Sequence, residues 1–275
     1  MLAVGALVLA LVIVFAWQSG IGQHSGTYVG VDLHSLVVDP ANPSHLFVGG
    51  HQGVARSDDA GHSWHPLRSL DDADAMGWAF TSAATWQSGH PGVHRSADGG
   101  LHFSGHNEGL PATDVHAFGG NDRILYAGSP VVGVMVSTDG AAHWDIRTRD
   151  TGQAFFGHIL VDPADPDHAV AADARAGAVE TTDGGRHWKV LGGVNGADWV
   201  SWAGDQPSHL VVTGDGQAAA SVDGGRTWQA LTVPDGVSIV EAAPTDASVL
   251  YAAAHRGTHA RIWVSRDGGA HWRTP

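Results

Sequence analysis

Ser221 to Trp228 reads SVDGGRTW, and close copies of this octapeptide occur five more times along the chain. The other copies begin at Ser57, Ser96, Ser137, Thr181 and Ser265. Successive copies start 39, 41, 44, 40 and 44 residues apart, a spacing that is typical of a repeated four-stranded unit and too short for independent domains. The repeats therefore predict an all-β array of six blades.

The residue types of the octapeptide indicate a structural role. Its third residue, an Asp, is suited to accept hydrogen bonds from backbone N–H groups of its own turn, and the Gly that follows adopts a positive φ at no steric cost. The last residue is Trp in five copies and Phe103 in the other, and such a side chain buries roughly 150–250 Å². We interpret the octapeptide as a hairpin turn with an aromatic wedge between sheets, and we assign it no catalytic chemistry.

The pattern S-x-D-G-G-x-x-W resembles the Asp-box, or bacterial neuraminidase repeat. It is found in sialidases, sortilin-type receptors, xyloglucan-hydrolysing propellers and photosystem II assembly factors. The resemblance covers residues 57–272 and implies a β-propeller fold. It does not choose among functions, because the family includes enzymes, receptors and assembly factors, and the box itself is scaffold.

Length and composition limit the classes of function. The chain has 275 residues, including 38 Gly and 11 Trp, and one repeat period runs through it, which fits a single all-β domain. A net charge of −14 repels polyanions and argues against nucleic acid as a partner. There is no Cys, so disulfides, thiolate metal sites and Cys nucleophiles are excluded. A monomer is expected.

The N-terminus is the one segment that does not follow the repeat. Residues 1–17 read MLAVGALVLALVIVFAW, an uncharged apolar run at the lower length limit for crossing a bilayer. It lacks the basic region and the clear cleavage site of a signal peptide. We therefore expect residues 1–20 to be a membrane anchor that places the domain outside the cytoplasm, with a cleaved signal and a secreted protein as the alternative. Residues 21–27 are the expected spacer, and residues 28–275 the expected six-bladed propeller.

Short apolar strands separated by Pro, Asn and Asp turns recur within each repeat and favour a propeller over a parallel sheet. Only three residues follow the last box, so the outer strand of the sixth blade must be very short or come from elsewhere in the chain. The segment Tyr28–Val31 is the candidate. Pairing of the first and last strands in one blade would close the ring and remove exposed strand edges.

Histidine is the informative residue, since the chain has 19 of them. Three follow the second strands of adjacent blades and are predicted to meet at the channel mouth as metal ligands: His51, His90 and His255. Polar residues also begin or lie on the inner strands, and of these we select as ligand-binding candidates Asp32, His34, Asp114, His116 and Glu241; Asp74 has a similar position. Imidazole and carboxylate together suit a divalent metal such as zinc or copper. Solvated loop residues are the alternative interpretation.

The sequence argues against a sialidase. Such an enzyme needs three arginines for the substrate carboxylate, a Tyr–Glu nucleophile pair and an Asp acid/base, and the sequence does not place this set. The similarity to xyloglucan-type hydrolases implies an inverting pair of carboxylates about 6.5–9.5 Å apart. Asp173 and Asp215 are the candidates for that pair, with Asp32 third. The similarity to photosystem assembly factors implies a basic protein-binding surface, which the acidic composition does not support.

The function that we expect is therefore a binding or scaffold module for a protein, a small molecule or a glycan, held at a membrane. A metal or small ligand is expected at the channel mouth. A glycoside hydrolase is the alternative.

Overall fold

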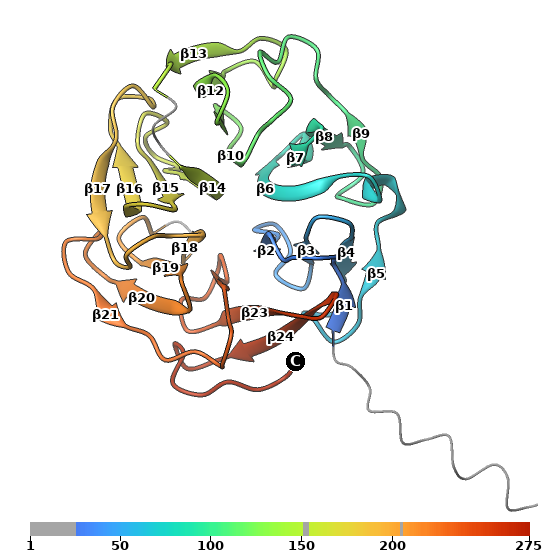
Figure 1. Ribbon diagram of the computed structural model, residues 1–275, viewed down its shortest axis with the longest axis vertical. Coiled ribbons are helices and arrows are strands. Elements are labelled where there is room, and N and C mark those ends of the chain that lie inside the picture. The colour runs from blue at the N-terminus through green and yellow to red at the C-terminus, as the bar shows by residue number, and fades with distance from the viewer. Residues whose placement is uncertain (1–25, 151–153, 204–205) are drawn as a thin grey trace, which may run out of the picture.

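The computed structural model describes residues 26–150, 154–203 and 206–275, and within them nearly all regular structure is β-strand. The exception is one short 3₁₀ turn, Arg68–Leu70. Figure 1 shows the sheets arranged around a ring, with one strand of each sheet facing the centre. This confirms the all-β prediction.

The described strands form sheets in which sequence neighbours pair with one another. The first sheet contains β2 (Ser35–Val38), β3 (Leu46–Gly49), β4 (Val54–Ser57) and β5 (His65–Pro66). The next contains β6 (Asp74–Thr81), β7 (Ala84–His90), β8 (Gly92–Ser96) and β9 (Ser104–Gly105).

An eight-stranded sheet follows. Its first half is β10 (Ala117–Gly120), β11 (Leu125–Ser129), β12 (Gly133–Ser137) and β13 (Asp145–Thr148), and its second half is β14 (Phe155–Val161), β15 (Ala169–Asp173), β16 (Gly177–Thr181) and β17 (Lys189–Gly192). The next sheet contains β18 (Trp199–Trp202), β19 (Leu210–Gly214), β20 (Gln217–Ser221) and β21 (Gln229–Ala230). The last contains β22 (Ile239–Ala242), β23 (Leu250–Arg256), β24 (His259–Ser265) and β1 (Gly26–Tyr28).

The inner strands contact one another around the ring in the order β2, β6, β10, β14, β18, β22 and back to β2. Strands β10 and β14 come close enough to pair in parallel and so join two sheets into one. Gly119 makes this approach feasible, because a Cβ there would lie 1.6 Å from the carbonyl oxygen of Ile159. The apolar core lies between neighbouring sheets, where Trp78 and Trp199 are fully buried.

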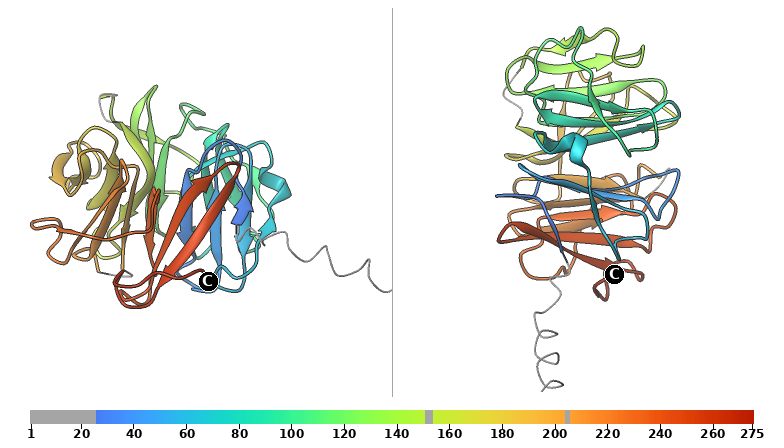
Figure 2. Two further views of the ribbon diagram at one scale, coloured as in Figure 1. Left: turned by 60° about the horizontal axis from the view of Figure 1, so that its bottom comes forward. Right: turned by 90° about the vertical axis from the view of Figure 1, so that its right-hand side faces the viewer.

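The first and last strands of the described chain close the ring. Strand β1 pairs antiparallel with β24, and Figure 2 shows the two side by side. The closing strand is Gly26–Tyr28, so of the predicted segment Tyr28–Val31 only Tyr28 lies in it, and two residues of the expected spacer belong to the strand. Val29, which follows, is fully buried. Closure by the N-terminal segment therefore occurs, with the strand placed two residues earlier than expected.

The octapeptide turns have the same hydrogen bonds in every copy. The hydroxyl at the first position accepts the backbone N–H at the fifth, as in Ser221 and Gly225 (2.9 Å). The Asp at the third position accepts the N–H at the seventh, as in Asp223 and Thr227 (2.9 Å). The backbone bond from Thr227 lowers the pKa of Asp223 to about 2. These contacts account for the octapeptide as turn structure.

Ala60 occupies a turn position at which other copies carry Gly, and its φ is 58°. This left-handed conformation costs an L-residue about 1–2 kcal/mol. Replacement by Gly removes that cost, but Gly has a larger conformational entropy in the unfolded chain, which offsets part of the gain. We expect Ala60→Gly to raise the free energy of unfolding by about 0.5–1 kcal/mol in denaturant titration. Ala142→Gly, in an exposed turn position without a positive φ, is the control and should be destabilising. A loss of stability in Ala60→Gly would show that the backbone at Ala60 is not strained.

The predicted membrane anchor, residues 1–20, and most of the expected spacer lie outside the described residues. Within the described ranges no helix has the length and apolar character needed to cross a bilayer.

Candidate functional site

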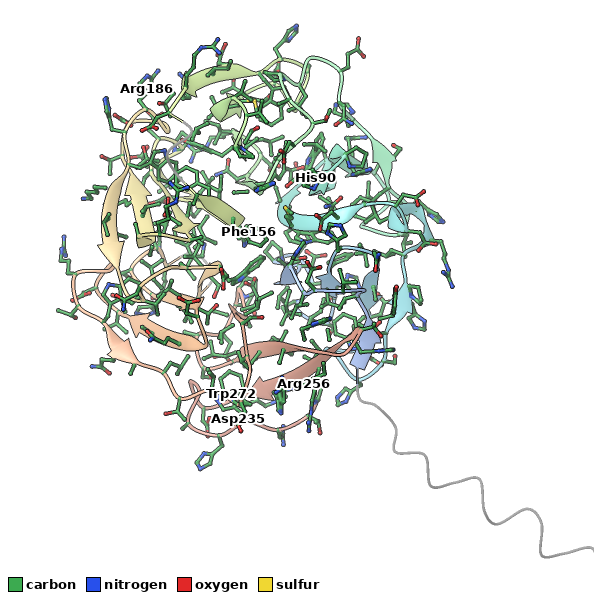
Figure 3. All side chains as sticks on the ribbon, in the orientation of Figure 1. His90, Phe156, Arg186, Asp235, Arg256 and Trp272 are labelled. Carbon is green, nitrogen blue, oxygen red and sulfur yellow. The ribbon has the colours of Figure 1, made fainter. Side chains whose placement is uncertain are left out.

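Histidine and aspartate side chains gather at the end of the channel where the inner strands begin. They come from the residues just before β2 and β10, from the start of β6, from the end of β7 and from the loop after β3. Figure 3 shows His90 and Phe156 facing this central region. We call this group the mouth cluster: Asp32, His34, His51, Asp74, His90, Asp114 and His116.

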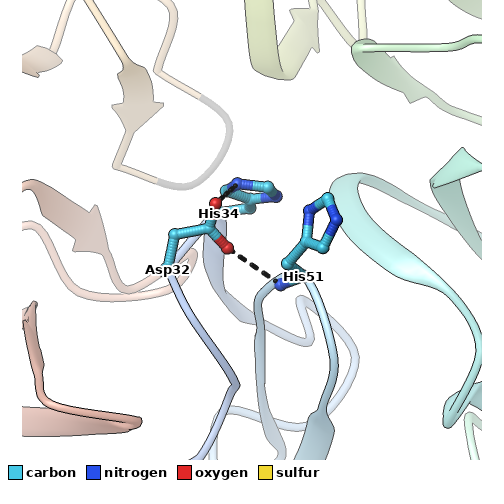
Figure 4. A group of neighbouring side chains, drawn as sticks. All are labelled: Asp32, His34 and His51. Atoms are coloured by element: carbon cyan, nitrogen blue, oxygen red, sulfur yellow. Dashed lines mark hydrogen bonds and ion pairs between the residues drawn. The ribbon is translucent and has the colours of Figure 1, made fainter.

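One half of the mouth cluster is formed by Asp32, His34 and His51, whose potential ligand atoms lie within 4.8 Å of one another. Nε2 of His34 is 3.0 Å from a carboxylate oxygen of Asp32. The backbone N–H of His51 donates to the other oxygen of Asp32 at 3.1 Å, which holds the loop after β3 against the start of the inner strand. Figure 4 shows the two imidazole rings beside each other above Asp32.

The other half is formed by His90, Asp114 and His116, with ligand atoms again within 4.8 Å of one another. Oδ1 of Asp114 lies 2.6 Å from Nε2 of His90 and 2.8 Å from Nε2 of His116. The imidazole rings of His90 and His116 meet edge to face at 5.3 Å. Two histidine nitrogens thus converge on one carboxylate.

Asp74 joins the two halves. Its carboxylate oxygens lie 2.5 Å from Nδ1 of His34 and 3.2 Å from Nδ1 of both His51 and His90. The Asp74 side chain is 4% exposed, whereas those of His51 and His90 are 50% and 44% exposed. A buried carboxylate therefore fixes the orientation of three imidazole rings, and those of His51 and His90 reach solvent.

The electrostatics of the mouth cluster follow from this buried charge. Burial alone would lower the pKa values of His34 and His90. The carboxylates of Asp74 and Asp32 beside His34, and of Asp114 and Asp74 beside His90, outweigh burial, so both pKa values are raised. Burial raises the pKa of Asp74, but the histidines outweigh it, so its pKa is lowered. Burial lowers the pKa of His116. Asp74 is therefore ionised at neutral pH and favours the protonated forms of His34 and His90.

Phe156 completes the cluster from the opposite side of the channel. Its ring meets those of His34 and His116 edge to face, at centroid distances of 5.3 and 6.2 Å. An apolar ring therefore lies between the two polar halves and shields one side of each.

The structure brings together most, but not all, of the residues selected from the sequence. His51 and His90 meet through Asp74, together with Asp32, His34, Asp114 and His116. His255 belongs to neither group of potential ligands among the described residues, and its Nε2 lies 2.9 Å from the carbonyl oxygen of Gly30. Glu241 is on β22, buried beside Trp199. With Ala242, its neighbour on β22, it lines a cavity at the other end of the channel.

The two residues chosen for a hydrolase pair have other surroundings. The Asp173 carboxylate is buried and accepts backbone N–H groups of Ala154, Arg175 and Ala176, which shapes its own loop. Asp215 is exposed in a turn with a φ of 50°.

Within the described residues, the tryptophans outside the octapeptides do not form an exposed platform of the kind that binds sugars. Four of the five, Trp78, Trp86, Trp199 and Trp263, are at most 9% exposed, and Trp202 is half-buried. Their burial therefore indicates packing side chains.

Sequence reasoning placed Asp74 at the start of an inner strand but assigned it no role, and it did not select Phe156. The signal for Asp74 was its match in position to Asp32 and Asp114. Phe156 lies at a shift of register between β14 and β15, and no repeat pattern marks such an irregularity.

Comparison with known proteins finds no matching protein family and no curated protein of similar sequence. Solved structures do match in fold. The chain is similar to the GH74 xyloglucanase from Xanthomonas campestris, with 17% identity, a TM-score of 0.63, and coverage of 90% of this chain and 46% of that one. It therefore spans about half of that enzyme.

Two further matches cover most of both chains. YCF48 bound to D1 peptide has 14% identity, a TM-score of 0.56, and coverage of 90% of this chain and 84% of that one. The WD40 repeats of RRP9 have 15% identity, a TM-score of 0.52, and coverage of 91% and 84%. At these identities the likeness shows the fold alone, which is a β-propeller.

Proposed function

We propose that the protein is a six-bladed Asp-box β-propeller that acts as a binding module and holds a divalent metal ion, Zn²⁺ or Cu²⁺, in the mouth cluster. The observation that carries this proposal is the position of Asp74. Its carboxylate meets Nδ1 of His34, His51 and His90. Nε2 of His34 and of His90 faces a second carboxylate, from Asp32 or Asp114.

This arrangement fits a metal site because a metal-bound histidine usually gives its other N–H to a carboxylate, which fixes the ring and its tautomer. Asp74 would serve as that outer carboxylate. Nε2 atoms and the oxygens of Asp32 and Asp114 would be the ligands, and Zn²⁺ accepts both kinds at about 2.0–2.2 Å. Small adjustments of exposed side chains bring such atoms from hydrogen-bond distance to ligand distance.

Two further features support a binding role outside the cytoplasm. A xyloglucanase, a peptide-bound propeller and a WD40 protein are among the structures with this fold, so a glycan or a protein is a reasonable partner for its exposed face. The apolar run at residues 1–17 supports an anchor at a membrane. A glycoside hydrolase is less well supported, because Asp173 holds its own loop.

The proposal is tested by titrating the metal-free protein with ZnCl₂ in calorimetry and in thermal unfolding. Zn²⁺ at a hundredfold excess over Kd is expected to raise the free energy of unfolding by about 2.7 kcal/mol. Binding should weaken as the pH falls, because protons compete for imidazole nitrogens. The pKa values of His34 and His90 are raised, so protons compete at these two rings more strongly than at an ordinary histidine.

A His51→Ala/His90→Ala variant should bind Zn²⁺ at least tenfold more weakly, because it removes a ligand from each half and leaves the buried His34–Asp74 pair in place. The matched control is His143→Ala/His187→Ala, two exposed octapeptide histidines that each contact an Asp of their own turn. His255→Ala should also bind as the wild type does. Equal affinity in all four proteins would overturn the metal site.

A further inference from the structure

The channel has a second end, where the inner strands finish. A cavity of about 180 Å³ lies there, lined by residues at or near the ends of β2, β6, β10, β14, β18 and β22. None of the mouth-cluster residues lines it. Its walls are mainly apolar and include Phe80, Leu160 and Trp202.

Glu241 contributes a buried carboxyl group to this cavity and is 4% exposed. The indole N–H of Trp199 donates to Oε2 of Glu241 at 3.0 Å. Burial raises the pKa of Glu241 to about 8, and the contacts with Trp199 and with the backbone N–H of Val38 oppose that rise only in part. The group therefore carries a proton at neutral pH and is a hydrogen-bond donor.

Two more polar residues line the cavity and have unused hydrogen-bonding capacity. Nδ2 of Asn121 and Nδ1 of His158 are buried and have no hydrogen-bond partner among the described residues. Oδ1 of Asn121 accepts the backbone N–H groups of Arg123 and Ile124, which leaves the NH₂ group as the unpaired end. A buried donor without a partner destabilises the protein, so an acceptor placed beside it is favoured.

His158 is neutral, because burial lowers its pKa to about 4. The cavity at neutral pH thus holds a neutral imidazole, an amide and a protonated carboxyl group, within apolar walls. It has no fixed charge to attract an ion, and it offers donors for an acceptor.

We propose that this cavity binds a compact, uncharged, mainly apolar molecule that presents a hydrogen-bond acceptor to Asn121 and Glu241. The size supports one ring with a short polar substituent, since an engineered apolar cavity of about 150 Å³ binds benzene. An organic cation is the competing ligand class. It would require Glu241 to ionise in a buried place, against the desolvation cost of that charge.

The test uses three probes of similar size on the full chain in the presence of EDTA, so that its result does not depend on the metal site. Acetophenone has a ring and a carbonyl acceptor, ethylbenzene lacks the acceptor, and 1-phenylethylamine is a cation at neutral pH. Affinities are measured at pH 6.5 by the shift of the Trp199 and Trp202 indole N–H signals in NMR. Acetophenone should bind at least tenfold more tightly than either of the others.

Two variants locate the interaction. Asn121→Asp keeps the oxygen that holds the turn but replaces the NH₂ donor, so acetophenone should bind at least tenfold more weakly. Asn195→Asp, at an exposed loop position, is the control and should leave the affinity unchanged.

The pH dependence tests Glu241. Affinity for acetophenone should fall as the pH rises from 6.5 to 9, because Glu241 loses the proton that it donates. Glu241→Gln keeps a donor at all pH values and should remove this dependence while it retains binding at pH 6.5. The proposal is overturned if the cation binds most tightly, if ethylbenzene binds as well as acetophenone, or if no probe binds at millimolar concentration.

Discussion

Removal of residues 1–30 is expected to lower the free energy of unfolding by about 4–6 kcal/mol, because the segment Gly26–Gly30 closes the ring. Burial of an aliphatic side chain such as Val29, which is fully buried, contributes about 1.5–3 kcal/mol. The rest comes from the pairing of β1 with β24, from the bonds of Val29 and Gly30 to the carbonyl of Thr258, and from the contact of His255 with Gly30.

The measurement is denaturant titration of the truncated chain against a control that lacks residues 1–25 and keeps β1. The control should be folded and rich in β-structure. The longer truncation should also aggregate more readily, since β24 becomes an unpaired sheet edge. Equal stability of the two chains would show that β1 does not hold the ring closed.

A point substitution tests the same closure without truncation. A Cβ at Gly26 would lie 2.2 Å from the carbonyl oxygen of Ala260, whereas a Cβ at Gly105, on the outer strand β9, meets nothing within 4 Å. Gly26→Ala should therefore reproduce part of the loss, and Gly105→Ala should not. Loss in both variants would point to a general effect of replacing strand glycines.

The fold was largely predictable because it depends on local chemistry that repeats. The hydroxyl, the Asp and the Gly of each octapeptide form the same turn at every copy, so spacing alone indicates the hairpins. The closing strand was harder to place. Gly26–Tyr28 is a three-residue edge strand, and its limits are set by its partner β24 rather than by any pattern of its own.

The site was predictable only in part. The sequence placed His51 and His90 after second strands and predicted that they lie near each other. In the structure His90 is the last residue of β7, and both rings contact Asp74. His255 was placed with them, but it lies within β23, next to the residues that follow β1, and its ring contacts the carbonyl of Gly30 instead. The role of Asp74 depends on burial beneath three rings from two sheets, and a single sequence carries no signal for that.

The cavity at the second end of the channel was not predictable, because it depends on which side chains from distant repeats enclose one another. Glu241 was selected for its place on an inner strand. Its raised pKa comes from burial, and the bond from Trp199, which lies 42 residues earlier on the neighbouring sheet, opposes that rise. Burial by residues that are distant in the sequence sets this pKa, and no local pattern indicates it.

Glu241 is therefore expected to make the wild-type protein less stable at alkaline pH, and Glu241→Gln should abolish that loss. The folded-state pKa, about 8, is raised above that of the unfolded chain by burial. The stability that the protonated group provides is fully present below the unfolded pKa of about 4.3 and is lost as the pH rises through about 8. Since each pKa unit corresponds to about 1.36 kcal/mol, the full loss is on the order of 5 kcal/mol.

The measurement is the difference in free energy of unfolding between wild type and Glu241→Gln, from denaturant titrations in EDTA between pH 5 and pH 9. Groups other than Glu241 titrate equally in both proteins, so this difference isolates the one carboxyl. It should shift in favour of the variant as the pH rises. Glu108→Gln, at an exposed loop position, is the control and should show no such shift. A difference that stays constant from pH 5 to pH 9 would mean that Glu241 does not titrate in this range, and the cavity would then hold a fixed charge rather than a donor.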